Sequence, residues 1–470
     1  MTRERQSATS SSRTPSQVQV STSTMSTEKS VEVALRSILF LAVFWFFWIS
    51  LKAFPDLRDP RVLLPNLGGD RLNQATALLM AGSCAVFAVF GDPKRYLVLA
   101  SPALVALLLW ICISAILSPY PALALKKFVL ACLIALQAAT LLLLPISKRH
   151  FAALITIGIG ATLLISYGGV ALVPHLAVHQ HTELLEPQLA GNWRGSFQHK
   201  NEAGTASILM MFFAIFIWRS GANLAGAALL TAAFVFLVGT GSKTPLALFA
   251  VTIFVSWMIL TVQGTTAKVV LVTTLLAIVT LGTVGSALLP PIHSALQAIG
   301  IDATFTDRTS IWSYAIGEAM SRPILGHGFQ SFWGTGDVFN SGSSIETWAN
   351  RASNAHNAYV EAFLTIGAPG LFLILAWLVI QPAADLAKSQ SRQADHPLNA
   401  LFVNIWIYGL FSAALESVFF VGGGPVWITL LLAVFGLRYQ ASAALATHAN
   451  DNKTSLQFAQ TRLSSAGQAT

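Results

Sequence analysis

The amino-acid sequence predicts an all-α polytopic membrane protein with about 12 transmembrane helices. Of its 470 residues, 28 are Lys or Arg and 20 are Asp or Glu, so 10% are charged, whereas soluble domains carry about 25%. Hydrophobic residues make up 54% of the chain. They fall in runs of about 15 to 22 residues, the length that crosses a hydrocarbon core about 30 Å thick. These figures exclude an ordinary soluble protein.

Hydropathy windows place the expected spans in order along the chain. They are residues 33–51, 75–90, 96–117, 128–146, 151–173, 203–218, 222–238, 245–262, 269–289, 359–380, 401–420 and 425–437. Residues 1–30 contain nine Ser and six Thr and no apolar run, which predicts a disordered tail. Residues 439–470 are again polar, so we expect a membrane domain over residues 31–438 between two disordered tails.

Basic residues set the expected orientation of the chain. An even number of spans puts both termini on one side, and a cytoplasmic N-terminus leaves 16 Lys and Arg inside and 12 outside. The short loops that carry Lys94-Arg95 and Lys148-Arg149 then face the cytoplasm. Both termini are therefore predicted to be cytoplasmic. The long connections 175–202 and 290–357 face outside, which is the periplasm in a two-membrane bacterium.

The net charge of +8 does not indicate nucleic-acid binding, because the basic residues are scattered one or two per loop. The three cysteines, Cys84, Cys112 and Cys132, lie inside apolar runs and are expected to pack as small hydrophobic residues.

The first polar cluster, residues 191–201, ends where a span begins. Arg194, His199, Lys200 and Asn201 stand there at the expected membrane edge. An Arg fork and a Lys point charge are suited to binding phosphate or diphosphate. Contact with lipid headgroups alone is the competing interpretation.

The second cluster, residues 239–244, is a tight turn that contains Lys243. Its Gly-Ser-Lys-Thr string lacks the full phosphate-loop pattern and stands between membrane helices, which excludes a nucleotide site. Lys243 either contacts a headgroup or substrate or belongs to a simple turn.

The third cluster frames a helix expected to lie on the membrane surface within loop 290–357. Its apolar residues are Ile311, Trp312, Ala315, Ile316, Ala319 and Met320. Asp307 is the expected cap and Pro323 ends the run. Arg308 near the helix start is opposed by the helix dipole, so a ligand or Asp307 must compensate it. Arg322 near the helix end is explained by the dipole alone.

The fourth cluster lies where loop 290–357 returns to a span. His356 and Tyr359 are three residues apart, and Asn357 and Glu361 are four apart, so a helix would carry them on adjacent stripes. A His with an amide neighbour at the water interface is suited to proton transfer, although a lone interfacial His is often merely solvated. Glu416 falls inside the span 401–420, where an uncompensated charge costs about 2.5 to 3.5 kcal/mol, so we expect it to face a cavity.

These four segments, in this order, resemble the O-antigen ligase and exopolysaccharide polymerase superfamily of bacterial inner-membrane proteins. Their motif strings are most similar to those of its exopolysaccharide-production branch. The similar strings are Arg-Gly-x-Phe-x-His-Lys-Asn at 194–201, Ser-Lys-Thr at 242–244, Asp-Arg-Thr-x-x-Trp with Arg-Pro-x-x-Gly-x-Gly over 307–328, and Ala-His-Asn-x-Tyr-x-Glu at 355–361.

The resemblance implies a GT-C-like glycosyltransferase that acts on a glycan carried by undecaprenyl diphosphate at the periplasmic face of the inner membrane. It places catalytic roles on His356, Arg194 and Arg308. The residues expected to bind substrate are Lys200, His199, Asn201, Lys243, Asn357, Tyr359 and Glu361. No metal and no other cofactor is expected, because the outer loops carry no acidic cluster. The expected partners are the lipid-linked oligosaccharide, an acceptor glycan and a chain-length regulator.

Combined with the motifs, the resemblance predicts a metal-independent inverting transfer. Arg194, Arg308 and Lys200 would stabilise the leaving diphosphate, and His356 would orient or deprotonate the acceptor hydroxyl. Polymerisation of exopolysaccharide or O-antigen repeat units and ligation of the glycan to lipid A core both stay open. A lipid-linked glycan flippase or transporter is the alternative from another class. It is disfavoured because ionisable residues gather at one face and the two halves of the chain show no repeat.

Overall fold

The computed structural model describes residues 16–60, 70–298, 308–335, 338 and 352–442, and the side chains from residue 29 onward. In this part of the chain the regular structure is helical, apart from one isolated antiparallel bridge between Val178 and Trp193. The all-α class predicted from composition is therefore confirmed.

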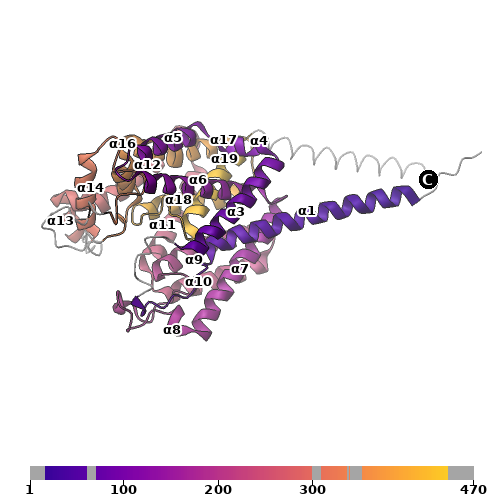
Figure 1. Cartoon of the computed structure of the whole chain (residues 1–470), viewed down its shortest axis with the longest axis horizontal. Helices are drawn as coiled ribbons and strands as arrows, with labels where there is room; N and C mark the ends of the chain where they lie inside the picture. Colours follow the sequence, from indigo (N-terminus) through magenta and orange to yellow (C-terminus); the bar gives the residue numbers. More distant parts are fainter. Residues whose placement is uncertain (1–15, 61–69, 299–307, 336–337, 339–351, 443–470) are drawn as a thin grey trace, which may run out of the picture.

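Figure 1 shows the helices packed into one bundle. They are α1 (Ser16–Trp48), α3 (Arg71–Phe90), α4 (Pro93–Leu99), α5 (Pro102–Ile116), α6 (Pro121–Leu143), α7 (Lys148–Leu172), α8 (Pro174–Ala177), η1 (Pro187–Leu189), α9 (Lys200–Arg219), α10 (Asn223–Thr240), α11 (Lys243–Thr261), α12 (Thr265–Leu288), α13 (Pro290–Ala298), α14 (Arg308–Ser321), α16 (Ala358–Leu375), η3 (Ala376–Ile380), α17 (Gln381–Ser391), α18 (His396–Ala413) and α19 (Pro425–Ala441).

Within the described residues, nine helices are long and apolar enough to cross a membrane. The other three predicted spans correspond to the bent pair α4 and α5, to α18, and to the 17-residue helix α19. The third span was predicted as one run over residues 96–117. It bends by 81° because Pro102 begins a new helix and the side chain of Ser101 caps it by accepting from the Leu104 amide.

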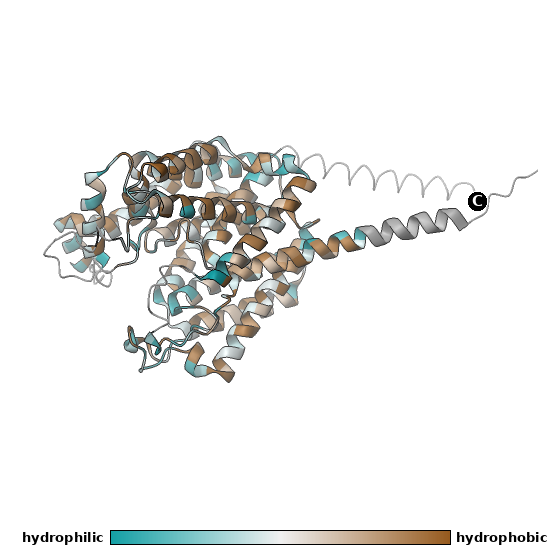
Figure 2. Ribbon diagram, in the orientation of Figure 1, coloured by the Kyte–Doolittle hydropathy of each residue, from teal (hydrophilic) through white to brown (hydrophobic). Residues whose placement is uncertain are grey.

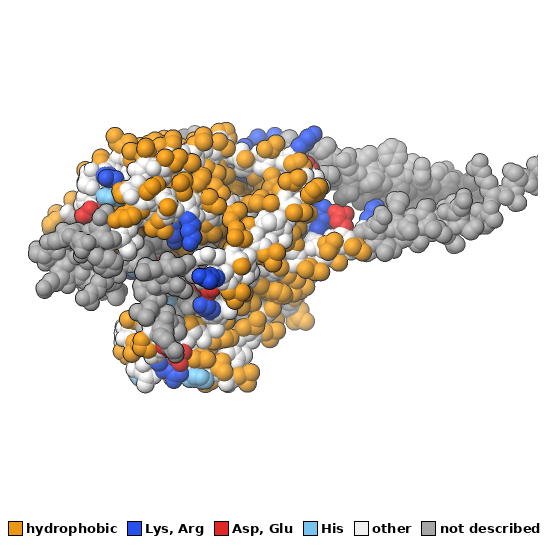
Figure 3. Space-filling model, viewed as in Figure 1, with side chains coloured by type: hydrophobic (Ala, Val, Ile, Leu, Met, Phe, Trp, Pro, Cys, Tyr) orange, Lys and Arg blue, Asp and Glu red, His pale blue; other side chains and the backbone are white. Residues whose placement is uncertain are grey.

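Apolar side chains occupy both the interior and the outer surface of the bundle. α9 and α18 are buried along most of their length. Many large hydrophobic side chains on the peripheral helices are exposed, and Figure 3 shows hydrophobic residues over much of one face. Figure 2 shows hydrophilic residues at the loops on the left and lower left. An apolar exterior with polar ends is expected where lipid surrounds a protein.

Of the two long connections, Figure 1 shows α13 and α14 at the left of the bundle and α8 at the bottom. α14 is the helix predicted over residues 311–320, but it was expected to lie on the membrane surface, whereas Ile311, Trp312, Ala315 and Ala319 are buried within the protein. Its apolar face packs on α12 and α16, so it contacts protein rather than a free membrane surface. Asp307, the expected cap, lies outside the described residues.

Helix α16 is interrupted at Gly367, and the loop after α14 fills the break. Gly367 has φ +70°, so its neighbours lose helical hydrogen bonds. The carbonyls of Leu364 and Thr365 accept instead from the amides of His327 and Gly328 (both 2.9 Å). The Ala368 amide donates to the Pro323 carbonyl, at 2.8 Å. The Arg-Pro-x-x-Gly-x-Gly string thus pairs backbone groups that the break leaves free.

Two expectations about segment ends are wrong. Of the predicted tail 1–30, residues 16–30 are part of α1, because extending a nucleated helix costs much less than starting one, and residues 1–15 lie outside the described part. Glu416 does not lie inside a span, because α18 ends at Ala413 and the chain turns before α19. Of the predicted C-terminal tail, residues 439–441 continue α19, and residues 443–470 lie outside the described part.

The close approach at Gly328 gives a stability prediction. Gly328 has φ +101°, and a Cβ there would lie 2.0 Å from Ser118 Oγ. We expect Gly328→Ala to destabilise the fold by about 2–4 kcal/mol through backbone strain and overpacking. Thermal unfolding of the detergent-purified protein measures this. The control is Gly317→Ala in α14, where a Cβ meets nothing within 4 Å; equal melting temperatures for the two variants would contradict the prediction.

Candidate functional site

The turn between α18 and α19, residues 414–424, is the point where the polar segments meet. Arg308 and His356 contact Glu416, and the Asn357 side chain donates to the Ala414 carbonyl at 2.8 Å. Gln330 Nε2 donates to the Phe420 carbonyl at 2.9 Å. A Cβ on Gly424 would lie 2.9 Å from Glu202 Oε1, so the start of α9 also contacts this turn. The α18–α19 turn therefore joins α9, α14, α16 and the loop after α14.

The Glu416 carboxylate is shared by two cationic or titratable side chains. Its Oε1 lies 2.7 Å from Arg308 Nη2, and its Oε2 lies 3.2 Å from His356 Nδ1. Arg308 also donates through Nη1 to the Leu415 carbonyl. The structure thus brings together two of the three residues predicted to be catalytic, and the compensation that Arg308 requires comes from Glu416.

This arrangement fixes the charge of Glu416 and the orientation of His356. Burial would raise the pKa of Glu416, but the hydrogen bond from His356 and the Arg308 charge outweigh it, so the pKa lies below its ordinary value. The carboxylate accepts from His356 Nδ1–H, which leaves Nε2 with its lone pair free. A His held in this tautomer by a carboxylate can accept a proton from a hydroxyl group.

The backbone at His356 is held in a conformation that non-glycine residues rarely adopt. His356 has φ +48°, and its amide donates to Asn354 Oδ1 at 2.9 Å. The next residue, Asn357, caps α16 by accepting from the amides of Tyr359 and Val360. Strain of this kind persists where surrounding contacts over-determine it, and it is common at functional sites.

Three residues predicted to bind substrate, Asn357, Tyr359 and Glu361, have hydrogen-bond partners within the protein. The Tyr359 hydroxyl donates to the Leu410 carbonyl at 3.0 Å. The Glu361 carboxylate accepts from Trp333 Nε1 (2.9 Å) and from the Ala355 amide (2.8 Å). Asn357 is also fully buried. These side chains shape the loop around His356, and their stripe on α16 points into the protein.

The other predicted residues form a second group at the start of α9. His179 is buried, and its Nδ1 donates to Glu183 Oε2 at 2.7 Å while its Nε2 accepts from the Lys200 amide at 3.2 Å. These contacts require a neutral ring, and burial lowers the His179 pKa accordingly. His179 thereby joins loop 174–199 to the first residue of α9.

Cations gather at the edge of this second group. His199 caps α9 and its Nε2 lies 3.0 Å from Glu186 Oε2, a contact that lowers the Glu186 pKa. Lys200 is near enough to Glu186 and Lys243 for their charges to act on it. Lys243 is exposed at the first position of α11.

Residues 239–244 form the turn that the sequence predicts. Gly241 caps α10 in the left-handed conformation, and the Ser242 hydroxyl donates to the Lys200 carbonyl at 2.9 Å and to Asn201 Oδ1 at 3.5 Å. The turn therefore fixes the start of α9 beside the start of α11.

Arg194 lies within loop 174–199 rather than at the Glu416 carboxylate. Its side chain is 0% exposed, and Nη2 donates to the Pro55 carbonyl at 2.6 Å. Burial lowers the Arg194 pKa, partly offset by the charges of Glu183 and Asp56. Its Nε and Nη1 find no hydrogen-bond partner among the described residues. In this conformation Arg194 is not accessible to a ligand.

Sequence reasoning missed three side chains of the site. Glu416 was recognised as unusual but placed inside a span, and its partners come from segments 60 and 108 residues away. His179 and Glu183 stand four residues apart in the loop, a spacing that could have indicated a pair. Within the described part of the chain, no three His, Cys, Asp or Glu side chains are grouped so that they could hold a metal ion.

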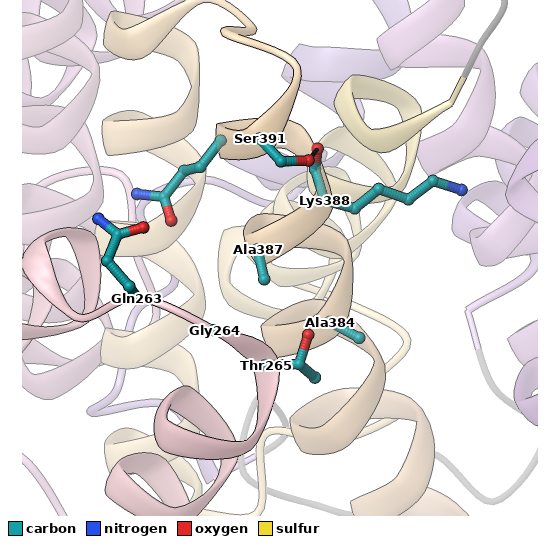
Figure 4. A pocket seen from close by; sticks show the side chains of 8 residues that line it. Gln263, Gly264, Thr265, Ala384, Ala387, Lys388 and Ser391 are labelled. Carbon is teal, nitrogen blue, oxygen red and sulfur yellow. Dashed lines mark hydrogen bonds between the residues drawn. The ribbon is translucent and has the colours of Figure 1, made fainter.

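A pocket of about 530 Å³ opens between the α11–α12 connection and α17, at the end of the bundle opposite the candidate site. Figure 4 shows its lining, in which Gln263, Thr265, Lys388 and Ser391 are the polar residues labelled. α11 begins beside Lys200 and crosses the bundle before it reaches this pocket. The pocket is therefore remote from both groups of predicted site residues.

Comparisons with known proteins agree with the motifs. Residues 226–375 match the family model described as O-antigen ligase. Over 109 residues the chain is 29% identical to the exopolysaccharide production protein ExoQ of Rhizobium meliloti, a match that covers 23% of this chain and 25% of that protein. Over 129 residues it is 28% identical to the "Putative polysaccharide ligase RP358" of Rickettsia prowazekii, covering 27% of this chain and 31% of that protein.

These matches confirm the resemblance to the O-antigen ligase superfamily. They span about a quarter to a third of the length of the curated relatives. The family match contains Lys243, Arg308 and His356 and ends before Glu416.

The capping role of Asn357 gives a prediction that distinguishes a structural role of this residue from a role in substrate binding. Asn357→Ala removes a helix cap and leaves the Ala414 carbonyl unpaired, so we expect a loss of about 2–4 kcal/mol of stability. Thermal unfolding measures it. Asn223→Ala, at an exposed helix start, is the matched control and should be neutral. An Asn357→Ala protein with wild-type stability would refute the structural role.

Proposed function

We propose that this protein is a glycosyltransferase of the bacterial inner membrane that moves a glycan from undecaprenyl diphosphate to an acceptor hydroxyl at the periplasmic face. Both termini are cytoplasmic in this proposal, so the α18–α19 turn and loop 174–199 face the periplasm. The observation that carries the proposal is the Glu416 carboxylate, which holds His356 and Arg308 side by side. The family match and the names of the relatives supply the class of substrate.

His356 acts as the general base in this proposal. Glu416 accepts from Nδ1–H, so Nε2 takes the proton of the acceptor hydroxyl. The acceptor oxygen attacks the anomeric carbon from the face opposite the diphosphate, and the bond between that carbon and the diphosphate oxygen breaks. The product therefore has inverted configuration at the anomeric carbon. The negatively charged Glu416 stabilises the imidazolium that forms.

Positive charge for the leaving diphosphate comes from this chain's own residues. Arg308, Lys200 and Lys243 stand at the first positions of α14, α9 and α11. A helix N-terminus has a positive dipole end, which favours bound phosphate. At α9 the amides of Lys200 and Asn201 are already bonded to His179 and His199, so the dipole and the Lys200 charge act there rather than free amides. These groups support a metal-independent transfer. Arg194 is assigned a positioning role, because it is buried and ties loop 174–199 to Pro55.

Polymerisation of exopolysaccharide or O-antigen repeat units is the reaction that we favour, since one relative is named for exopolysaccharide production. Transfer to lipid A core is the second candidate, which the family description and the other relative's name favour. The two reactions share the donor and differ in the acceptor. A chain-length regulator would act with the polymerase.

We expect His356→Ala to lower transfer by about 10²- to 10⁴-fold, because the general base is lost. The assay uses the full chain in proteoliposomes, undecaprenyl-diphosphate-linked repeat units as donor, and EDTA in the buffer. His293→Ala, at a half-buried histidine on α13 that is hydrogen-bonded to Gln297, is the matched control and should transfer at the wild-type rate.

Three outcomes of this assay would overturn parts of the proposal. A fully active His356→Ala protein would exclude His356 as the general base. Activity lost in EDTA and restored by Mg²⁺ alone would exclude the metal-independent scheme. Movement of labelled lipid-linked glycan across the bilayer without transfer would indicate a transporter.

Glu416 is a positioning residue in this scheme, and its charge can be tested separately. Glu416→Gln keeps an oxygen acceptor but removes the charge that stabilises the imidazolium, so we expect kcat to fall about 10- to 100-fold with little change in KM. Glu416→Asp keeps the charge and should retain more activity. Equal activity of the two variants, or an effect on KM alone, would show that Glu416 has a merely structural role.

A further inference from the structure

A second pocket opens at the end of the bundle that carries the candidate site, beside the last turn of α14. It has a volume of about 190 Å³. Its lining includes the aromatic residues Tyr120, Tyr314 and Phe332 and the polar residues Glu318, Arg322 and His327. Figure 3 shows basic, histidine and acidic side chains close together at the left end of the molecule, where Figure 1 labels α14 and α16.

The two charged side chains of this pocket have no partner of their own. Glu318 and Arg322 are four residues apart, yet the Glu318 carboxylate and the Arg322 guanidinium form no ion pair or hydrogen bond in the part of the chain that the structure describes. A carboxylate offers acceptors and a guanidinium offers donors. The pocket therefore presents both kinds of hydrogen-bonding group to a ligand.

Packing fixes the rest of the pocket wall. His327 Nε2 donates to the Glu318 carbonyl at 3.0 Å, and its ring meets the Phe332 ring edge to face at 4.9 Å. Tyr314 packs against Phe332 with ring centroids 6.3 Å apart. Ser331 is buried and bonded to the Ser118 hydroxyl at 3.0 Å. Because these contacts are already made, the wall needs little reordering when a ligand binds.

We propose that this pocket binds one sugar unit of the glycan substrate, away from the bond that forms. This inference rests on the function proposed above. A sugar ring has apolar C–H faces that pack on aromatic rings, and hydroxyl groups that both donate to a carboxylate and accept from a guanidinium. Opposite charges on one wall suit a neutral, hydroxyl-rich ring better than a phosphate or an acyl chain.

The fold sets the distance between this pocket and the transfer centre. Arg308 and Glu318 are ten residues apart on α14, which corresponds to roughly 15 Å along a helix axis. That distance is longer than a single sugar ring. The pocket therefore holds a sugar several units along a chain whose reacting end lies at His356, and it favours long glycans over short ones.

The test measures binding of two oligosaccharides, one and four repeat units long, released from the polysaccharide that the host strain exports. The protein is the full chain in lipid nanodiscs with His356→Ala, so that no transfer occurs. We expect the long oligosaccharide to bind more tightly than the short one. Adding Glu318→Gln and Arg322→Gln should weaken binding of the long oligosaccharide about tenfold and leave the short one unchanged.

Controls separate this inference from the proposed function. Met320→Gln lies on the same helix outside the pocket lining and should bind both oligosaccharides normally. Thermal unfolding of each variant confirms that it is folded. Unchanged binding in the folded Glu318 and Arg322 variants would overturn the pocket while leaving the role of His356 intact. If the His356→Ala protein transferred glycan at the wild-type rate, the proposed catalytic role of His356 would be wrong. The oligosaccharide-binding measurement would still test the pocket.

Discussion

The candidate site depends on one electrostatic constraint: cationic side chains stand at helix N-termini, where the helix dipole opposes them. Arg308, Lys200 and Lys243 occupy the first positions of their helices. Each such placement costs roughly 0.3–1 kcal/mol unless an anion compensates it. Glu416 compensates Arg308, and the charge of Glu186 acts on Lys200. Lys243 is left exposed to solvent, available to an anionic substrate.

The end of α18 makes this compensation possible. If α18 continued to residue 420, as the hydropathy pattern predicts, Glu416 would lie in the bilayer and could not meet two partners from distant segments. Because the helix stops at Ala413, the carbonyls of Ala414 and Leu415 are also free to accept from Asn357 and Arg308. One turn thus provides a carboxylate and two carbonyls to the segments that carry the predicted chemistry.

The sequence predicts the membrane spans well because each span is a local property: a run of apolar residues of sufficient length. The motifs locate the polar end of the bundle for a similar reason, since charges are scarce. What each polar residue does depends on long-range contacts. Arg194 was predicted to be catalytic, and its side chain is buried against Pro55, 139 residues away. Tyr359 and Glu361 lie on the predicted helix, but the stripe faces inward because Leu410 and Trp333 pack there. Nothing in the local pattern distinguishes these outcomes.

The same packing connects the transfer centre to the proposed sugar pocket. α14 carries Arg308 at its start and Glu318 in its last turns, so one helix contributes to both. α16 begins two residues after His356, and its break at Gly367 lies beside the carbonyls that accept from the amides of His327 and Gly328. Because both helices are fixed to each other through buried Trp312, whose Nε1 donates to the Ala355 carbonyl at 3.0 Å, the spacing between the two sites is set by the fold. Only a glycan long enough to span the distance set by α14 can occupy the transfer centre and the sugar pocket at once. This requirement is a physical basis for distinguishing long acceptors from short ones.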